Sequence, residues 1–240
     1  MSRAQEEFAR SLEATLVRPT AKVADVNRLA QSAGELACGA VVVLPPLVAT
    51  ARARVGRGAV RVVAAVGLPF GAEGAAALAA SGAQAVGDGA DILDVVVSLP
   101  LLANGDFPAA RDELARAVTA ANAAAPEGRH VVVRAVIETC YLEPPAWRLA
   151  ARLVQAAGCD GVVCATGLGP EGATPAAIEA LRAELSPERV VKAQGGIRSL
   201  ADAQRALAAG ADLLGVADPA GLLAEFAEAG AARRRRPAGG

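Results

Sequence analysis

Four charged side chains interrupt otherwise apolar runs of this chain. Asp94 lies within I-L-D-V-V-V, Arg134 and Glu138 within V-V-V-R-A-V-I-E-T, and Lys192 within V-V-K-A-Q-G-G. A buried charge is costly unless it is paired or used in chemistry. An amine beside carboxylates suits general acid/base or imine chemistry. The alternative is a buried salt-bridge cluster that only neutralises itself. We favour a catalytic pocket, because these groups come from three different runs.

The elements that must position these groups alternate along the whole chain. Short β-branched runs predict eight strands, separated by Ala/Leu-rich stretches such as 72–88 and 106–125 with helical spacing of apolar residues. The expected strands are 12–17, 39–44, 61–66, 92–97, 131–137, 161–165, 190–194 and 213–216. The 240 residues match the ~250 typical of a (β/α)8 TIM barrel. We therefore predict an α/β chain with one barrel domain over 1–230, whose inward side chains near the strand ends form the site.

Glycines follow three of the predicted strands. Gly167 comes after the sixth strand, Gly195 and Gly196 after the seventh, and Gly215 is in the eighth. Backbone amides in such loops can bind an anion at the mouth of a barrel. Glycines at strand ends also serve as simple turn formers, so the pattern alone leaves both roles open.

Composition and charge exclude several classes of function. The net charge of −1 gives no field for nucleic acid, and we expect no nucleic-acid partner. The arginine-rich end, 231–240, is expected to be a disordered, solvated tail. The longest apolar run, 40–49, is too short to span a bilayer, and the charged amino terminus lacks a signal-peptide pattern. These features predict a cytoplasmic protein without a membrane partner.

The cysteines and the histidine favour neither a disulfide framework nor a metal site. The thiols show no C-x-x-C spacing, and His130 is the single histidine. We expect structural thiols, no metal and no cofactor. The cysteines are Cys38, Cys140, Cys159 and Cys164.

Seven motifs in order carry a family likeness. They are S-L-E-A-T-L-V-R-P-T (11–20), V-G-L-P-F-G (66–71), G-A-D-I-L-D-V-V (89–96), V-I-E-T-C-Y-L (136–142), G-L-G-P-E-G-A-T-P (167–175), K-A-Q-G-G-I-R-S (192–199) and A-G-A-D-L-L-G (209–215). Over nearly its whole length the chain resembles deoxyribose-phosphate aldolase. The resemblance implies a metal-free class I aldolase barrel. It also implies a Schiff-base lysine on strand six, a second lysine on strand seven and a proton-transferring aspartate on strand four. Asp94 and Lys192 stand at the last two positions.

The residue at the Schiff-base position departs from the family. The segment that resembles F-V-K-T-S-T-G reads G-V-V-C-A-T-G here, so Val163 replaces the nucleophile. Valine has no lone pair with which to attack a carbonyl. The neighbouring Cys164 should face the helices, because successive strand residues point to opposite sides. Only Lys192 is left inside the predicted barrel, since Lys22 is the other lysine of the chain.

The loop after strand eight departs as well. The family resemblance implies two serines there, but Gly215 is followed by V-A-D-P. We expect the Asp218 carboxylate to repel a phosphate by roughly 4 kcal/mol per charge pair at close range before screening. Donors would remain at Thr166, Gly167, Gly195 and Gly196. This combination favours an unphosphorylated carbonyl or sugar-like substrate, with Arg134, Val163 and Asp218 also lining the substrate site.

Three interpretations follow. In the first, which we favour, the protein is a repurposed carbon–carbon lyase in which Lys192 forms the imine, Asp94 shuttles protons and Glu138 assists. In the second, Asp94 and Lys192 act as acid and base without a Schiff base. In the third, the barrel has lost turnover and is a binding or regulatory protein. Under all three interpretations we expect weak or absent cleavage of 2-deoxyribose 5-phosphate. A homodimer is suggested by the resemblance alone.

Overall fold

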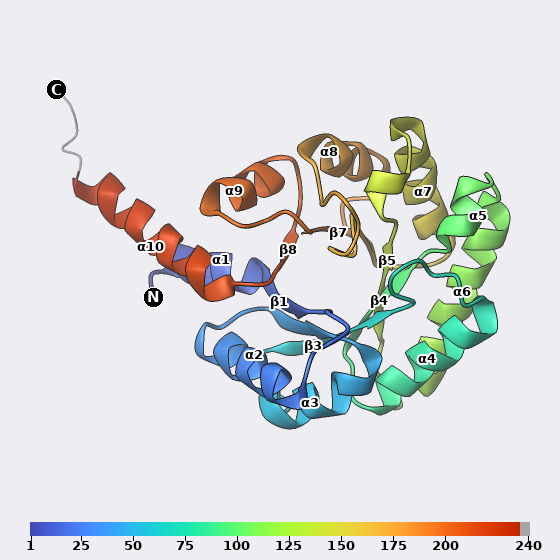
Figure 1. Cartoon of the computed structure of the whole chain (residues 1–240), viewed down its shortest axis with the longest axis horizontal. Helices are drawn as coiled ribbons and strands as arrows, with labels where there is room; N and C mark the ends of the chain where they lie inside the picture. The colour runs from blue at the N-terminus through green and yellow to red at the C-terminus, as the bar shows by residue number, and fades with distance from the viewer. Residues whose placement is uncertain (236–240) are drawn as a thin grey trace.

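A closed barrel of eight parallel strands forms the centre of the protein. The computed structural model describes residues 1–235, and Figure 1 shows the strands ringed by helices. The strands pair in chain order, with β8 closing on β1. They are β1 (Leu12–Leu16), β2 (Ala40–Val43), β3 (Arg61–Val66), β4 (Ile92–Val96), β5 (Val132–Val136), β6 (Gly161–Val163), β7 (Val190–Gln194) and β8 (Leu213–Val216). The predicted TIM barrel and all eight predicted strands are confirmed.

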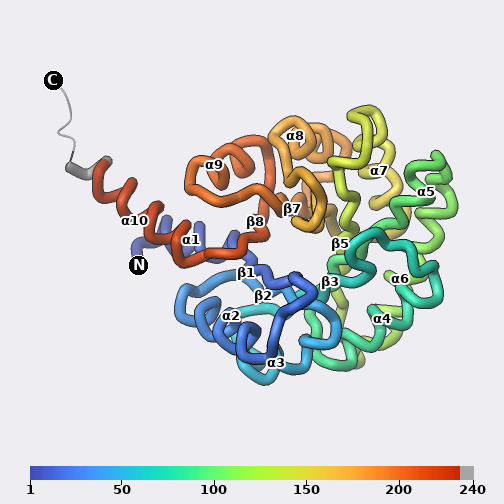
Figure 2. The backbone as a smooth tube through the Cα atoms, viewed as in Figure 1, coloured from blue at the N-terminus to red at the C-terminus, as the bar shows by residue number. Residues whose placement is uncertain are grey.

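Helices connect successive strands and cover the outside of the barrel, as the backbone trace in Figure 2 shows. The α-helices are α1 (Arg3–Ser11), α2 (Val23–Glu35), α3 (Val48–Val55), α4 (Ala75–Gly87), α5 (Leu99–Ala103), α6 (Phe107–Ala124), α7 (Pro144–Ala156), α8 (Pro175–Glu184), α9 (Leu200–Ala208) and α10 (Pro219–Arg235). Two short 3-10 helices, η1 (Pro45–Leu47) and η2 (Thr139–Tyr141), follow β2 and β5. Helix α10 lies beside α1, where Phe226 stacks on Phe8 with ring centroids 4.7 Å apart.

Successive side chains of a strand point alternately to the apolar core between strands and helices and to the inside of the barrel. Leu93, Val133 and Val191 belong to the large apolar core between strands and helices. Their neighbours Asp94, Arg134 and Lys192 point into the barrel. Cys164 belongs to the outer core, as expected, and burial raises the pKa of its thiol to about 12. It is therefore a packing residue, protonated at neutral pH.

A repeated contact at the amino-terminal end of the barrel fixes the strand register. An aspartate just before β4, β6 and β8 accepts the backbone N–H of a residue in the preceding strand. The pairs are Asp91 with Val62 (2.8 Å), Asp160 with Val133 (2.9 Å) and Asp212 with Val191 (2.8 Å). Each contact satisfies a strand amide at the rim of the barrel.

The carboxyl-terminal segment differs from the sequence expectation. Helix α10 continues to Arg235, so residues 231–235, which we expected to be disordered, are helical. The rest of the predicted tail, 236–240, lies outside the described residues. Among residues 1–235, no helix combines the length and apolar character that crossing a membrane would require.

Leu93→Ala should destabilise the protein by about 2–5 kcal/mol, because Leu93 is fully buried between β4 and the helices. The measurement is urea unfolding followed by circular dichroism. The matched control is Leu149→Ala on α7, where the side chain is 46% exposed and the cost should stay below about 1 kcal/mol. Equal losses in the two variants would contradict the assignment of the outer core.

Candidate functional site

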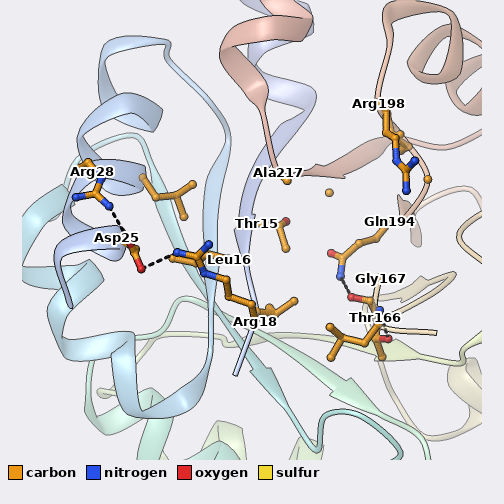
Figure 3. A pocket seen from close by; sticks show the side chains of 17 residues that line it. Thr15, Leu16, Arg18, Asp25, Arg28, Thr166, Gly167, Gln194, Arg198 and Ala217 are labelled. Atoms are coloured by element: carbon orange, nitrogen blue, oxygen red, sulfur yellow. Dashed lines mark hydrogen bonds and ion pairs between the residues drawn. The ribbon is translucent and has the colours of Figure 1, made fainter. Parts of the chain in front are cut away.

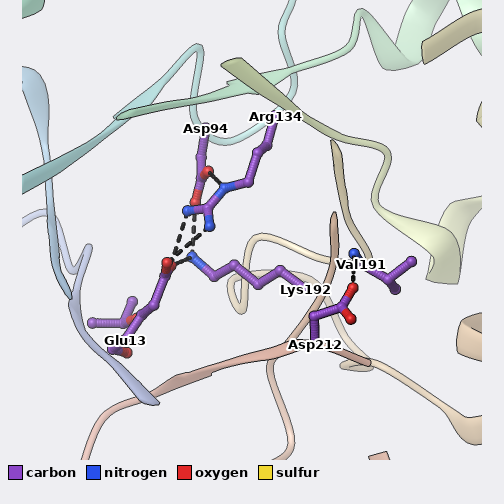
Figure 4. A network of polar contacts seen from close by, with 7 residues as sticks. Glu13, Asp94, Arg134, Val191, Lys192 and Asp212 are labelled. Carbon is purple, nitrogen blue, oxygen red and sulfur yellow. Dashed lines mark hydrogen bonds and ion pairs between the residues drawn. The ribbon is translucent and has the colours of Figure 1, made fainter. Parts of the chain in front are cut away.

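Four charged side chains from four strands meet inside the barrel (Figure 4). We call Glu13, Asp94, Arg134 and Lys192 the buried ion quartet. Arg134 donates Nε to Asp94 at 2.6 Å, and its Nη1 and Nη2 donate to the two oxygens of Glu13 at 2.8 and 2.9 Å. The Lys192 Nζ lies 2.8 Å from Asp94 and 2.6 Å from Glu13. Each cation therefore bridges both carboxylates.

The quartet is electrically neutral, with two carboxylates and two cations. Burial raises the pKa of Glu13, but the charges of Arg134 and Lys192 outweigh it and lower that pKa from 4.5 to about 2. Burial likewise lowers the pKa of Arg134, yet Asp94 and then Glu13 raise it well above its usual value. Glu13 and Arg134 are thus held in their charged forms by their partners, and the ion pairing makes the burial of the quartet tolerable.

Glu13 was missed when the candidates were chosen from the sequence. Its strand, L-E-A-T-L, is short, and one acidic residue near its start suggests a solvent-facing position. The signal that could have identified Glu13 is the alternation of side-chain direction along a strand. Leu12 and Ala14 are fully buried on the outer side, so Glu13 must face inward.

Three valines pack together inside the barrel, and one of them, Val163, stands at the position that the family resemblance assigns to the Schiff-base lysine. Val163 is fully buried and packs with Val96 and Val136, with Leu68 against them. Val163 pairs with Lys192 across β6 and β7. Lys192 is also fully buried and is not among the residues that line the cavity at the barrel mouth. The amine is therefore enclosed by carboxylates and by apolar side chains.

An open cavity of about 550 Å³ lies at the carboxyl-terminal end of the barrel, and we call it the mouth cavity (Figure 3). Its lining includes Thr15 on β1 and Gln194 on β7. These residues follow Glu13 and Lys192 by two positions on the same strands. The cavity thus begins about 6 to 7 Å further along the strands than the quartet.

A network of hydrogen bonds fixes the loop after β6 against this cavity. The buried Glu138 carboxylate accepts the Thr166 N–H at 2.8 Å, and Gln194 Nε2 donates to the Thr166 carbonyl at 2.6 Å. The Thr166 hydroxyl accepts the N–H of Leu168 at 3.0 Å. Glu138 therefore holds the loop and takes no part in the quartet, although the sequence grouped it with Lys192 and Asp94.

Glycines bring two loops into close contact at the mouth. A Cβ on Gly172 would lie 2.2 Å from the Gly195 carbonyl, so only glycine permits this approach. Gly167, Gly195 and Gly196 all line the cavity. Within residues 1–235, their three N–H groups donate to no protein acceptor. Unpaired amides clustered at one cavity can bind an anion.

The cavity also carries an excess of positive charge. Its lining includes Arg18, Arg28 and Arg198 against one acid, Asp25. Asp25 is bound by Arg18 at 2.7 Å and by Arg28. The Arg198 side chain is exposed and has no acidic partner within residues 1–235. Three cations against one carboxylate leave a net charge of +2, which favours an anionic ligand.

Asp218 lies away from this lining. Its Oδ1 accepts the N–H of Gly221 at 3.0 Å and so caps the start of α10. Ala217, one residue earlier, lines the mouth cavity, whereas Asp218 does not. The direct repulsion of a phosphate by Asp218, expected from the sequence, therefore loses its geometric basis, because an aspartate at this position serves the helix instead.

The predicted site residues thus separate into two groups. Asp94, Arg134 and Lys192 meet in the quartet, and Val163 stands opposite Lys192 on the neighbouring strand. Thr166, Gly167, Gly195 and Gly196 meet at the mouth cavity. Within residues 1–235, no group of three or more His, Cys, Asp or Glu side chains could hold a metal ion.

Known proteins similar to this chain agree with its motifs. No protein-family model matches it. Deoxyribose-phosphate aldolase of Carboxydothermus hydrogenoformans is 33% identical over 217 residues, which cover 90% of this chain and 94% of that protein. The chain belongs to the deoxyribose-phosphate aldolase family. The enzyme of that name from Thermococcus kodakarensis is 33% identical over 88% of this chain and 93% of its own length.

Solved structures agree with the family assignment. Deoxyribose phosphate aldolase from Aeropyrum pernix, described as a unique tetramer, matches with a TM-score of 0.83 and 27% identity over 94% of this chain and 93% of its own. An aldolase called QR15 matches with a TM-score of 0.84 and 25% identity over 93% of this chain and 97% of its own. Aldolase-family relatives thus share nearly the whole barrel.

The quartet predicts how stability depends on pH. The pKa of Glu13 is lowered in the folded protein, so its contribution is fully present above about pH 5 and is lost as pH falls toward 2. A difference of 4.5 − 2 = 2.5 units corresponds to on the order of 3 kcal/mol. Glu13→Gln should therefore be less stable than wild type at pH 7, and this gap should close between pH 5 and pH 2 in urea unfolding.

The control for this prediction is Glu73→Gln, which removes an exposed carboxylate with no ion-pair partner in the described part of the chain. Its stability should follow that of wild type throughout. A Glu13→Gln gap that is independent of pH would contradict the ion pairing of Glu13.

Proposed function

We propose that this protein is a ligand-binding member of the deoxyribose-phosphate aldolase family that does not form a Schiff base. One observation carries the proposal. The only inward lysine is fully buried within the ion quartet, while a separate open cavity with unused donors lies at the mouth of the barrel. Imine formation needs an unprotonated amine that a carbonyl carbon can reach. The enclosure of Lys192 supports the interpretation in which turnover has been lost.

The proposed ligand is a small anion of the sugar-phosphate kind. The unpaired N–H groups of Gly167, Gly195 and Gly196 and the exposed Arg198 support an anionic group at the mouth. The capping role of Asp218 removes the reason to disfavour phosphate. We therefore replace the unphosphorylated substrate expected from sequence with an anionic one.

Gln194 supports a hydroxyl group on the same ligand. Its side chain is 94% buried, since only 6% is exposed, and it extends into the mouth cavity in Figure 3. Nε2 is used by the Thr166 carbonyl, whereas Oε1 has no donor. A buried acceptor without a donor costs about 1–3 kcal/mol. A ligand hydroxyl donating to Oε1 would remove this cost.

The imine-forming alternative has one specific observation in its favour. Lys192 lies 2.8 Å from Asp94, the residue to which the family resemblance assigns proton transfer. For Lys192 to act as nucleophile, its contacts with Glu13 and Asp94 would have to open and Val163 would have to move. The same requirement applies to acid/base catalysis without an imine, because Asp94 and Lys192 are buried and neither lines the mouth cavity.

The first test is reductive trapping with acetaldehyde and sodium borohydride, followed by peptide mass mapping. Wild-type Lys192 should gain no ethyl group, because its amine is enclosed. Exposed Lys22 is the internal reference and should be modified. Labelling of Lys192 as fast as Lys22 would overturn the proposal and restore the imine interpretation. In the same preparations, 2-deoxyribose 5-phosphate should be cleaved weakly or not at all.

The second test measures binding to the mouth cavity by isothermal titration calorimetry. We expect 2-deoxyribose 5-phosphate to bind at least about tenfold more tightly than 2-deoxyribose, because the phosphate gains charge-assisted hydrogen bonds. Arg198→Gln should remove most of this difference. Arg116→Gln, which changes an exposed arginine on α6, is the matched control and should bind as wild type does. Equal affinity for the two sugars would contradict an anionic ligand.

A further inference from the structure

A second cavity lies at the opposite end of the barrel, and we call it the basal cavity. It measures about 530 Å³ and opens where β3 and β5 begin and where the loop before β4 passes. Its lining is strongly basic, with Asp91 as the single acid. The charged and ionisable lining residues are Arg52, Arg57, Arg61, Asp91, Arg129 and His130. Neither the mouth cavity nor the quartet involves any of them.

Part of this cluster has a structural role. Asp91 accepts the Val62 N–H at 2.8 Å and pairs with Arg52 and Arg129. Arg52 also donates Nε to the Gly89 carbonyl at 2.9 Å and Nη1 to the Gly56 carbonyl. All three nitrogens of Arg52 are thereby used, so this arginine holds two loops together and has little left for a ligand.

The other two rim aspartates, which come before β6 and β8, show how many basic partners such a carboxylate needs. Asp160 accepts the Val133 N–H and pairs with His130 at 3.1 Å. Asp212 accepts the Val191 N–H and pairs with Arg182 at 3.2 Å. Each rim position is thus completed by a single basic partner. The position of Asp91 has two arginines in contact and two more beside it, which exceeds what the barrel requires.

The surplus cations face open space. Arg57 and Arg61 are exposed, and neither side chain has a hydrogen-bond or ion-pair partner among residues 1–235. Arg129 uses Nη2 for Asp91 and keeps its other donors free. Gly58 and Ala59 add no bulk to the lining. Four arginines against one aspartate leave a net charge of +3 around the cavity, with His130 counted as neutral.

We propose that the basal cavity is a second binding site, for a small oligophosphate. Arginine guanidinium groups bind phosphate oxygens through paired N–H donors, so three of them suit a ligand with several phosphate groups. A volume of about 530 Å³ falls within the range of small-molecule sites. The net charge of −1 for the whole chain argues against a nucleic-acid surface.

Calorimetry with inorganic tripolyphosphate tests the site in near-physiological salt. Arg198→Gln is the background, so that the mouth cavity contributes little. Adding Arg57→Gln and Arg61→Gln should weaken binding at least about tenfold. The matched control adds Arg10→Gln and Arg116→Gln, two exposed arginines elsewhere, and should change affinity by less than about twofold. Melting temperatures without ligand would confirm that all variants fold.

Three outcomes would overturn the proposal. One is no binding of tripolyphosphate to the background protein at millimolar concentration. Another is an equal loss in the control pair, which would show a general effect of net charge. The third is binding of duplex DNA that is tighter than tripolyphosphate and equally sensitive to Arg57→Gln and Arg61→Gln, which would assign the surface to a macromolecule. None of these results would bear on the mouth cavity, because Arg198 is absent from every protein compared.

Discussion

The neutrality of the buried ion quartet is the constraint on which the rest of the barrel depends. Two carboxylates and two cations from β1, β4, β5 and β7 are almost fully buried at the barrel centre. Removing one partner of such a group leaves an uncompensated buried charge, at a cost of about 3–5 kcal/mol. The strands must therefore keep a register that brings all four side chains to one level. The rim aspartates, each bound to an amide of the preceding strand, support that register from below.

This constraint changes what the retention of Asp94 and Lys192 means. From sequence alone, buried charges in the barrel favour catalysis, because a pocket without chemistry has no need of them. In the folded protein the four charges depend on one another, so none can be lost singly without a large penalty. Val163 is different, because it carries no charge and is not part of the quartet. The residue type at this position can therefore change without unbalancing the four buried charges.

Sequence predicted the fold well and the site in part, for physical reasons. Strands buried on both faces read as continuous apolar runs, so all eight could be recognised, and charges within three of them identified Asp94, Arg134 and Lys192. Glu13 was missed because its run is short. Glu138 was placed among the catalytic residues and Asp218 in the substrate site, because sequence does not show which backbone N–H a carboxylate accepts. In the structure, Glu138 fixes the Thr166 loop and Asp218 caps α10.

The two ends of the barrel differ in how their charge is used. At the amino-terminal rim, carboxylates satisfy strand amides, and arginines satisfy the carboxylates, which is a stabilising role typical of that face. At the mouth, glycine loops leave amides unpaired, and Gln194 keeps an acceptor without a donor. Unsatisfied polar groups are costly in a folded protein, so they persist where a ligand completes them. By the same reasoning, arginines in excess of the rim's structural need point to a ligand in the basal cavity. The barrel thus separates two polar surfaces, and no residue of the quartet lines either cavity.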